Sequence, residues 1–195
     1  MNGSSSRNSN IVFAAYKDKR TVFRLKDIAM LSGETDFISI NKKMHYGVKT
    51  GKFLHLRKGI YAKEGYLTEE LACILYTPTY ISLEYVLQKA GILFQFDSAI
   101  TLTGYLSRTI AIDQHTYVYR KIKSEILVNT QGILRLDNQI NMATPERAFL
   151  DLLYLNKDYY FDNLTPLNPG TIENLLPIYN SKALANRVAK LFTHG

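Results

Sequence analysis

The chain has 195 residues, of which 46% are hydrophobic and 12% aromatic, so the composition predicts one or two packed domains and excludes a disordered chain. One cysteine excludes an internal disulfide and a thiolate metal cluster, and no apolar run approaches the roughly 18 residues of a membrane helix, so we expect a cytoplasmic protein without a membrane segment. The net charge of +7 is concentrated in residues 1–65, which carry +8 against −1 for residues 66–195, and this asymmetry favours a polyanion-binding module joined to a neutral domain.

Residues 10–33 predict a helix, a short strand and a second helix. Asn10 can cap a helix that runs to about Lys17. Residues 21–23 form a β-prone run. Apolar side chains then recur at the spacing of an amphipathic helix that Gly33 would end, namely Leu25, Ile28 and Ala29.

Residues 34–62 predict a third helix and a β-hairpin. Residues 34–36 offer N-caps for a helix over residues 37–50. Two β-prone runs, 53–56 and 60–62, flank a basic turn that contains glycine, which predicts a hairpin. The order helix, strand, helix, turn, helix, hairpin is that of a winged helix-turn-helix.

The helix over residues 37–50 has one apolar face, which consists of Phe37, Ile40, Met44 and Val48. Its other face suits the major groove of DNA, where lysines meet phosphates or guanine edges and hydroxyl groups add phosphate contacts. Lysines on a solvated surface helix are the alternative explanation, but the neighbouring basic turn favours DNA binding. The predicted DNA-binding residues are Ser39, Lys42, Lys43, Tyr46 and Lys49 in the helix, and Arg57 and Lys58 in the turn, whereas we expect His55 and Tyr61 to pack or lie on the surface.

The charge balance changes near residues 63–65, so we place the domain boundary there, with one domain over residues 1–65 and another over residues 66–195. The second domain combines predicted helices over 68–76 and 81–90, strands over 100–103, 109–112, 116–119 and 133–136, and helices beyond residue 144, the last over 181–192. Thr144 and Pro145 are typical of a helix start, for a helix to about Leu155. The predicted fold class is therefore α+β, with an N-terminal winged helix-turn-helix followed by a mixed α/β domain.

Carboxylates among the predicted strands make a metal-dependent nucleic-acid-processing enzyme the rival class. They are Asp97, Asp113, Glu125 and Asp137. No Glu-x-Lys pattern follows a strand aspartate, His115 has no partner at ligand spacing, and no glycine-rich phosphate loop occurs. We therefore expect no enzymatic activity, no cofactor and no metal. A protein-interaction module that docks an acidic partner through its basic segment is a third class.

The segment TVFRLKDIAMLSGETDFISINKKMHYGVKTGKFLHLRKGIYA, residues 21–62, resembles the N-terminal winged helix of AbiEi-type antitoxins, which are also described as transcriptional regulators of viral defence systems. Later segments are similar to the second domain of that family: AITLTGYLSR (99–108), MATPERAFLDLLYL (142–155) and YNSKALANRVAKLF (179–192). The resemblance covers nearly the whole chain. Its most specific pieces are LRKGIY in the hairpin and ATPERA at the helix start.

The resemblance implies the antitoxin of a type IV toxin–antitoxin, or abortive-infection, system. The N-terminal domain of that family represses its own promoter by binding inverted repeats. Either a dimer or two monomers could bind such repeats. The second domain counters a nucleotidyltransferase-like toxin, and no direct complex with that toxin is expected. The resemblance assigns helix contacts to Lys42, Lys43, Tyr46 and Lys49, and wing contacts to Arg57 and Lys58. It assigns the start of a helix in the second domain to residues 144–147. We interpret Thr144 as the cap of that helix, Pro145 as its first-turn proline, Glu146 as its first-turn carboxylate and Arg147 as the partner of Glu146.

Overall fold

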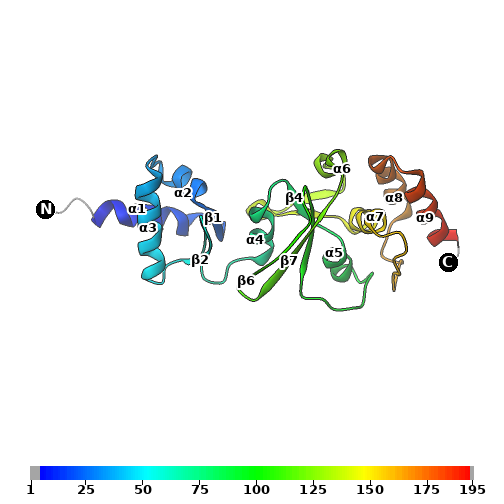
Figure 1. The fold of residues 1–195 in the computed structure, drawn as a ribbon, viewed down its shortest axis with the longest axis horizontal. Coiled ribbons are helices and arrows are strands. Elements are labelled where there is room, and N and C mark those ends of the chain that lie inside the picture. Colours follow the sequence, from blue (N-terminus) through cyan, green and yellow to red (C-terminus); the bar gives the residue numbers. More distant parts are fainter. Residues whose placement is uncertain (1–4, 194–195) are drawn as a thin grey trace. The chain divides into compact units, whose positions relative to one another are not determined.

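The computed structural model describes residues 5–193 and divides the chain into two compact units, residues 1–74 and 75–195 (Figure 1). The division falls nine residues after the boundary expected at residue 65, because the helix α4 (Thr68–Leu75) is hydrogen-bonded to the first unit. The buried carboxylate of Glu70 in α4 accepts hydrogen bonds from the backbone N–H groups of Thr21 (2.9 Å) and Val22 (3.2 Å) and from the Thr21 hydroxyl (2.6 Å). These bonds satisfy the backbone N–H groups at the start of the first strand of this unit.

The first unit has its elements in the predicted order. They are α1 (Ser5–Lys17), β1 (Val22–Arg24), α2 (Leu25–Ser32), α3 (Phe37–Lys49), β2 (Leu54–Arg57) and β3 (Ile60–Ala62). The first helix begins at Ser5, so Asn10 lies inside it and the prediction of a cap at Asn10 is wrong. The strand β3 pairs with both β1 and β2 in antiparallel fashion, which makes a three-stranded sheet in the order β1-β3-β2.

The core of the first unit joins the helices α1, α2 and α3 to the sheet. Its buried members are Ile11, Ala15, Phe23, Ile28, Ile40, Met44, Phe53 and Tyr61. Gly47 lies in the last turn of α3, where a Cβ atom would come within 3.1 Å of the Phe53 ring. Glycine weakens a helix interior, but here it lets the ring pack against the helix backbone.

The ends of α2 and α3 follow the predicted capping. Gly33 ends α2 with a φ of +69°, a left-handed conformation that glycine adopts without strain. Asp36 begins α3, because its carboxylate accepts a hydrogen bond from the Ile38 N–H (2.9 Å). The four-residue connection from Gly33 to Asp36 therefore fixes where α3 starts.

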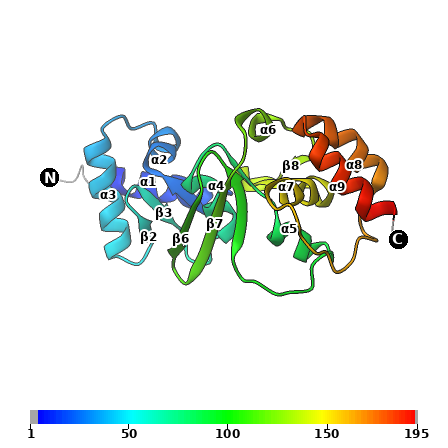
Figure 2. The same cartoon turned by 45° about the vertical axis from the view of Figure 1, so that its right-hand side comes forward.

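The second unit is mixed α and β, with a six-stranded sheet in the order β6-β7-β5-β4-β9-β8. The strands are β4 (Thr79–Ile81), β5 (Ile100–Gly104), β6 (Arg108–Ile112), β7 (His115–Lys121), β8 (Ile133–Arg135) and β9 (Asn141–Ala143). The helices are α5 (Glu84–Lys89), α6 (Ser124–Val128), α7 (Pro145–Leu155), α8 (Pro169–Leu175) and α9 (Lys182–Thr193), with short 3₁₀ turns at Asp137–Gln139 and Leu176–Tyr179. The helix α7 lies between the sheet and the helices α8 and α9 (Figure 2).

The helix predicted over residues 81–90 is confirmed from Glu84 to Lys89, but its predicted start at Ile81 is wrong. Residues 79–81 form the strand β4, which pairs antiparallel with β5 and parallel with β9, and the helix α5 begins only at Glu84. Leu83 separates them with a φ of +64°. The pairing of Ile81 with Met142 joins positions 61 residues apart, which no local pattern reports.

The helix α7 begins as predicted, since the Thr144 hydroxyl accepts a hydrogen bond from the Arg147 N–H. The interpretation of Arg147 as the partner of Glu146 is wrong. The Arg147 side chain is completely buried and pairs with Asp151 one turn later (3.3 Å), while the Glu146 carboxylate accepts from the Asn168 N–H.

No helix in residues 5–193 is both long enough and apolar enough to cross a membrane.

Candidate nucleic-acid interface

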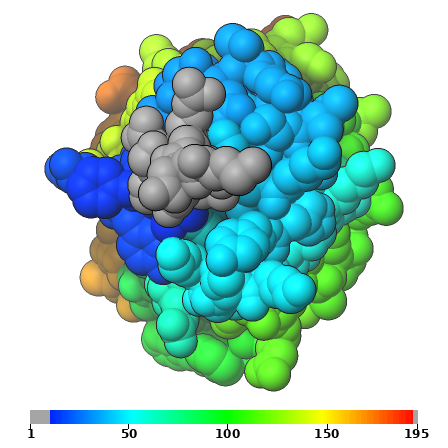
Figure 3. All heavy atoms as spheres, turned by 90° about the vertical axis from the view of Figure 1, so that its left-hand side faces the viewer, coloured from blue at the N-terminus to red at the C-terminus, as the bar shows by residue number. Residues whose placement is uncertain are grey.

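One face of α3 is buried and the opposite face is exposed. Ile40 and Met44 have no exposed surface, so their packing fixes the rotation of the helix about its axis. The exposed face carries four of the seven predicted contact residues, of which Ser39 is half-buried and Lys42, Tyr46 and Lys49 are exposed. Figure 3 shows the surface of the first unit, where atoms of the α3 segment are coloured sky blue to cyan.

Lys43 differs from the other lysines of α3. Its ammonium group lies 2.5 Å from the Glu34 carboxylate, and both side chains are mostly buried, with 17% and 26% of their surface exposed. Glu34 is in the connection between α2 and α3. Lys43 therefore holds this connection against α3 in the free protein.

Arg57 at the end of β2 and Lys58 in the turn that follows are both exposed. Gly59 follows with a φ of +74°, a conformation that favours glycine and closes the turn. The Gly59 carbonyl accepts a hydrogen bond from the Leu25 N–H (3.0 Å). The turn is thus tied to the first residue of α2.

A shallow hollow of about 500 Å³ separates the start of α3 from the turn. Its lining is mainly apolar, and it places Lys42 of α3 and Lys58 of the turn on the same depression. The residues around it are Leu25, Phe37, Ile38, Asn41, Lys42, His45, His55, Lys58, Gly59 and Tyr61. The helix and the turn therefore contribute to one surface.

Phe37 lies in this hollow and is 51% exposed, so its assignment to the buried face of α3 is wrong. Phe37 is the first residue of α3, and Ile40 is the first residue of this helix that is buried in the core. The neighbouring Ile38 is 70% exposed. Its spacing of four residues from Lys42 places it on the exposed face, which the helical period alone could have indicated.

Aromatic side chains line the hollow. The His55 and Tyr61 rings stack with their centroids 5.1 Å apart, and the His45 ring meets His55 edge-on at 5.6 Å. Tyr61 is 1% exposed and donates from its hydroxyl to the Asn41 side-chain oxygen (2.9 Å). Burial raises the pKa of Tyr61. Tyr61 thus packs as expected, while His55 lies on the surface above it.

Several other cations of the first unit serve its own structure. The Arg20 guanidinium binds the Asp18 carboxylate (2.8 Å) and holds the pKa of that carboxyl below its ordinary value. Arg24 donates to the Ile74 carbonyl oxygen, and Lys63 donates to the Asp18 carbonyl oxygen (2.6 Å). In contrast, Lys42, Lys49 and Lys58 make no ion pair with any residue of the described part of the chain.

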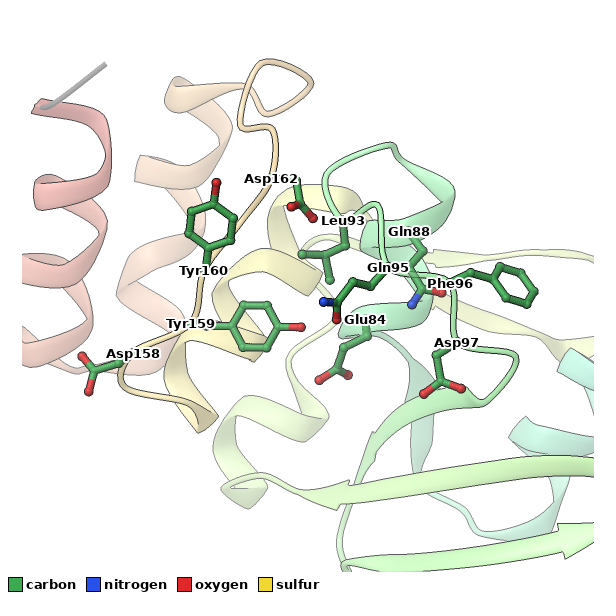
Figure 4. A pocket seen from close by; sticks show the side chains of 10 residues that line it. All are labelled: Glu84, Gln88, Leu93, Gln95, Phe96, Asp97, Asp158, Tyr159, Tyr160 and Asp162. Atoms are coloured by element: carbon green, nitrogen blue, oxygen red, sulfur yellow. The ribbon is translucent and has the colours of Figure 1, made fainter.

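A second depression, in the other unit, gathers acidic and aromatic side chains (Figure 4). Its volume is about 650 Å³. Three of its four carboxylates have structural partners: Asp97 accepts from the Ala99 N–H, Asp162 from the Phe94 N–H, and Glu84 pairs with Arg120 at 3.5 Å. Asp97 and Asp158 lie at opposite ends of the pocket (Figure 4). The residues that line it are Glu84, Gln88, Leu93, Gln95, Phe96, Asp97, Asp158, Tyr159, Tyr160 and Asp162.

The remaining carboxylates that define the rival enzyme class do not join this pocket. Asp113, Glu125 and Asp137 are exposed, and Asp113 lies in the turn between β6 and β7. Within residues 5–193, no three His, Cys, Asp or Glu side chains gather where they could hold a metal ion.

No protein-family model matches the sequence, and no curated protein is similar to it. Among solved structures, the fold is similar to that of the RV2827C protein from Mycobacterium tuberculosis, with a TM-score of 0.53. The alignment covers 95% of this chain and 76% of that chain at 14% sequence identity. At this identity the likeness concerns the fold, which is mixed α and β.

Proposed function

We propose that this protein binds double-stranded DNA through residues 1–74 and regulates transcription from its own promoter in the cytoplasm. In this proposal the first unit is a winged helix-turn-helix, with α3 as the recognition helix and the turn between β2 and β3 as the wing. The proposal names Ser39, Lys42, Tyr46, Lys49, Arg57 and Lys58 as contacts, with Lys43 released from Glu34 only if a phosphate replaces that carboxylate.

One observation carries the proposal: Lys42, Lys49 and Lys58 are exposed on α3 and the turn and make no ion pair within the described residues. An exposed lysine that is not paired within the protein can neutralise a phosphate without breaking an internal bond. Each such contact releases counterions from the duplex and favours binding. The overall charge of the chain, +7, acts in the same direction over longer distances.

The test compares two variants with the same change in charge. Lys42→Glu/Lys49→Glu reverses two charges on the exposed face of α3 and leaves Ile40 and Met44 to pack. Lys123→Glu/Lys157→Glu reverses two exposed charges in the second unit. Binding to duplex DNA is measured by fluorescence anisotropy at 50–300 mM salt. We expect the α3 variant to lose at least 100-fold in affinity and about two units of the log–log salt slope, at roughly 0.9 per phosphate contact, while the control loses little.

Equal losses in the two variants would show that only the net charge matters and would contradict the proposed interface. Adding Mg²⁺ or Mn²⁺ to the same mixtures tests the rival enzyme class, because a nuclease would shorten the duplex. Affinity that persists for acidic polypeptides but not for DNA would favour the protein-interaction class instead.

We further propose that residues 75–195 act as the antitoxin domain against a nucleotidyltransferase-like toxin. Two of the three segments that resemble the second domain of AbiEi-type antitoxins, residues 142–155 and 179–192, meet in one buried cluster, and the pairing of β4 with β5 links the third segment, residues 99–108, to it. Tyr179 donates to the Asp151 carboxylate (2.7 Å), and so does Tyr80 (3.0 Å) from β4, the strand that pairs with β5. This common core supports a single functional domain.

A further inference from the structure

The start of α3 exposes two apolar side chains beside the proposed phosphate contacts. Ile38 is 70% exposed and Phe37 is 51% exposed. Both border the hollow between α3 and the turn, where Lys42 and Lys58 lie as well. Single exposed apolar residues need no explanation, but two neighbours on a surface otherwise suited to a polyanion do.

The position of Ile38 is fixed by the structure around it. Asp36 caps the helix through the Ile38 N–H, and Ile40, two residues later, is fully buried in the core. Lys42 follows one turn after Ile38 on the same face of the helix. A duplex that lies along this face with Lys42 on its phosphates would therefore bring base edges against the first turn of α3.

Base edges in the major groove offer one apolar group to such a side chain, the 5-methyl group of thymine. Residues at the N-terminal end of a recognition helix are those that reach base edges in helix-turn-helix proteins. Isoleucine has no hydrogen-bonding group, so it can discriminate only through this methyl group. We propose that Ile38, with Phe37 beside it, reads a thymine methyl group in the major groove, an inference that rests on the proposed DNA binding.

The alternative is that Ile38 acts as a wedge between two base pairs. Apolar wedges of this kind are typical of minor-groove proteins that unstack and kink the duplex. The flanking lysines and the capped helix favour the major groove, because that groove admits an α-helix. The two readings differ in an observable way: only the methyl contact depends on the base's 5-methyl group.

The test begins with duplexes that the full-length chain enriches from a random library. Each thymine position of the enriched sequence is then replaced by deoxyuridine, which removes the methyl group and keeps every hydrogen-bonding atom. Affinities are measured for the unmodified chain, for Ile38→Ala and for Val128→Ala. Val128 is a matched control, since it is 67% exposed and belongs to the second unit.

We expect deoxyuridine at one position per binding site to weaken binding by about fourfold, as the loss of one buried methyl contact predicts. Ile38→Ala should bind the thymine duplex at least fourfold more weakly and no longer distinguish thymine from deoxyuridine at that position. Val128→Ala should keep the full discrimination. This coupling between a protein side chain and a single methyl group is what a merely structural role of Ile38 would not produce.

Tight binding that is indifferent to deoxyuridine at every position, or an enriched sequence without thymine, would overturn the methyl contact and leave DNA binding intact. Increased fluorescence of 2-aminopurine on binding, lost in Ile38→Ala, would assign Ile38 as a wedge instead. Failure to bind or enrich any duplex would refute the proposed function itself, and the inference with it.

Discussion

Arg147 has no exposed surface, and its guanidinium is surrounded by acceptors from distant parts of the second unit. It donates to the carbonyl oxygens of Ile126 (2.7 Å) and Gln131 (2.8 Å), to the Tyr80 hydroxyl (3.0 Å) and to the Asp151 carboxylate (3.3 Å). A buried charge is tolerated only when it is paired and hydrogen-bonded in this way. The sequence places Arg147 and Asp151 four residues apart on a helix, which indicates a pair, but the carbonyl partners depend on the tertiary fold.

Two tyrosines of this cluster give the second unit a distinctive response to alkaline pH. Burial raises the pKa of Tyr80 and Tyr179, and the neighbouring Asp151 carboxylate acts in the same direction. Above pH 10 the unfolded chain releases protons that the folded chain retains. The free energy of unfolding should therefore fall as pH rises above 10, by about 1.4 kcal/mol per pH unit for each tyrosine.

Urea unfolding between pH 9 and pH 11 measures this slope. Tyr179→Phe removes one titrating group, so its slope should be smaller than that of the unmodified chain by about 1.4 kcal/mol per pH unit. Tyr160→Phe is the control, because the Tyr160 ring is 80% exposed, and it should leave the slope unchanged. Identical slopes in all three proteins would contradict a titrating role for Tyr179.

The elements divide into those that local patterns determine and those that they do not. The helices α2, α3 and α7 were predictable because the apolar spacing agrees with a local end signal in each segment, such as Gly33 after α2 and the caps Asp36 and Thr144. The strands β4 and β9 were missed because each has three residues and because their mutual pairing joins positions 61 residues apart. Helical periodicity indicated that the candidate contacts Lys42 and Lys49 are exposed. It could not show that Phe37, at the start of α3, lies outside the core.

Gly132 joins two elements of the second unit, and its replacement should be costly for two reasons. Its φ is +72°, and a Cβ atom would lie 2.9 Å from the Arg147 Cβ atom and 3.2 Å from the Leu175 side chain. Its carbonyl oxygen also accepts a hydrogen bond from the Thr144 N–H at the start of α7 (2.8 Å). We expect Gly132→Ala to lower the free energy of unfolding by about 2–4 kcal/mol, since backbone strain and overpacking add.

Gly91→Ala separates these two contributions. Gly91 has a φ of +69°, but no atom lies within 4 Å of the position that its Cβ would take. It should therefore show the cost of strain alone, about 1 kcal/mol. Denaturant unfolding of both variants provides the comparison, and equal losses would mean that the close approach of Gly132 to α7 contributes nothing.

At the scale of the whole molecule, charge is distributed unequally between the two units. Residues 1–74 contain 13 lysines and arginines against 7 carboxylates, whereas residues 75–195 contain 11 against 10. Each unit also has its own buried cluster, around Met44 in the first and around Arg147 in the second. Separate cores and separate charge imply that damage to one unit can spare the other.

This separation makes the two proposed roles independently testable in a host that carries the toxin. The chain is expressed from an unrelated promoter, so its own repression does not affect its level. Lys42→Glu/Lys49→Glu changes exposed side chains, whose substitution usually alters stability by only about 0.5 kcal/mol, and should abolish promoter binding while protection from the toxin persists. Leu150→Asp places a carboxylate at a fully buried position of α7 and should unfold the second unit and abolish protection. Leu134→Asp is its control, because Leu134 is 49% exposed, and should protect normally. Loss of protection in the α3 variant, with its circular dichroism unchanged, would show that DNA binding is itself the protective act.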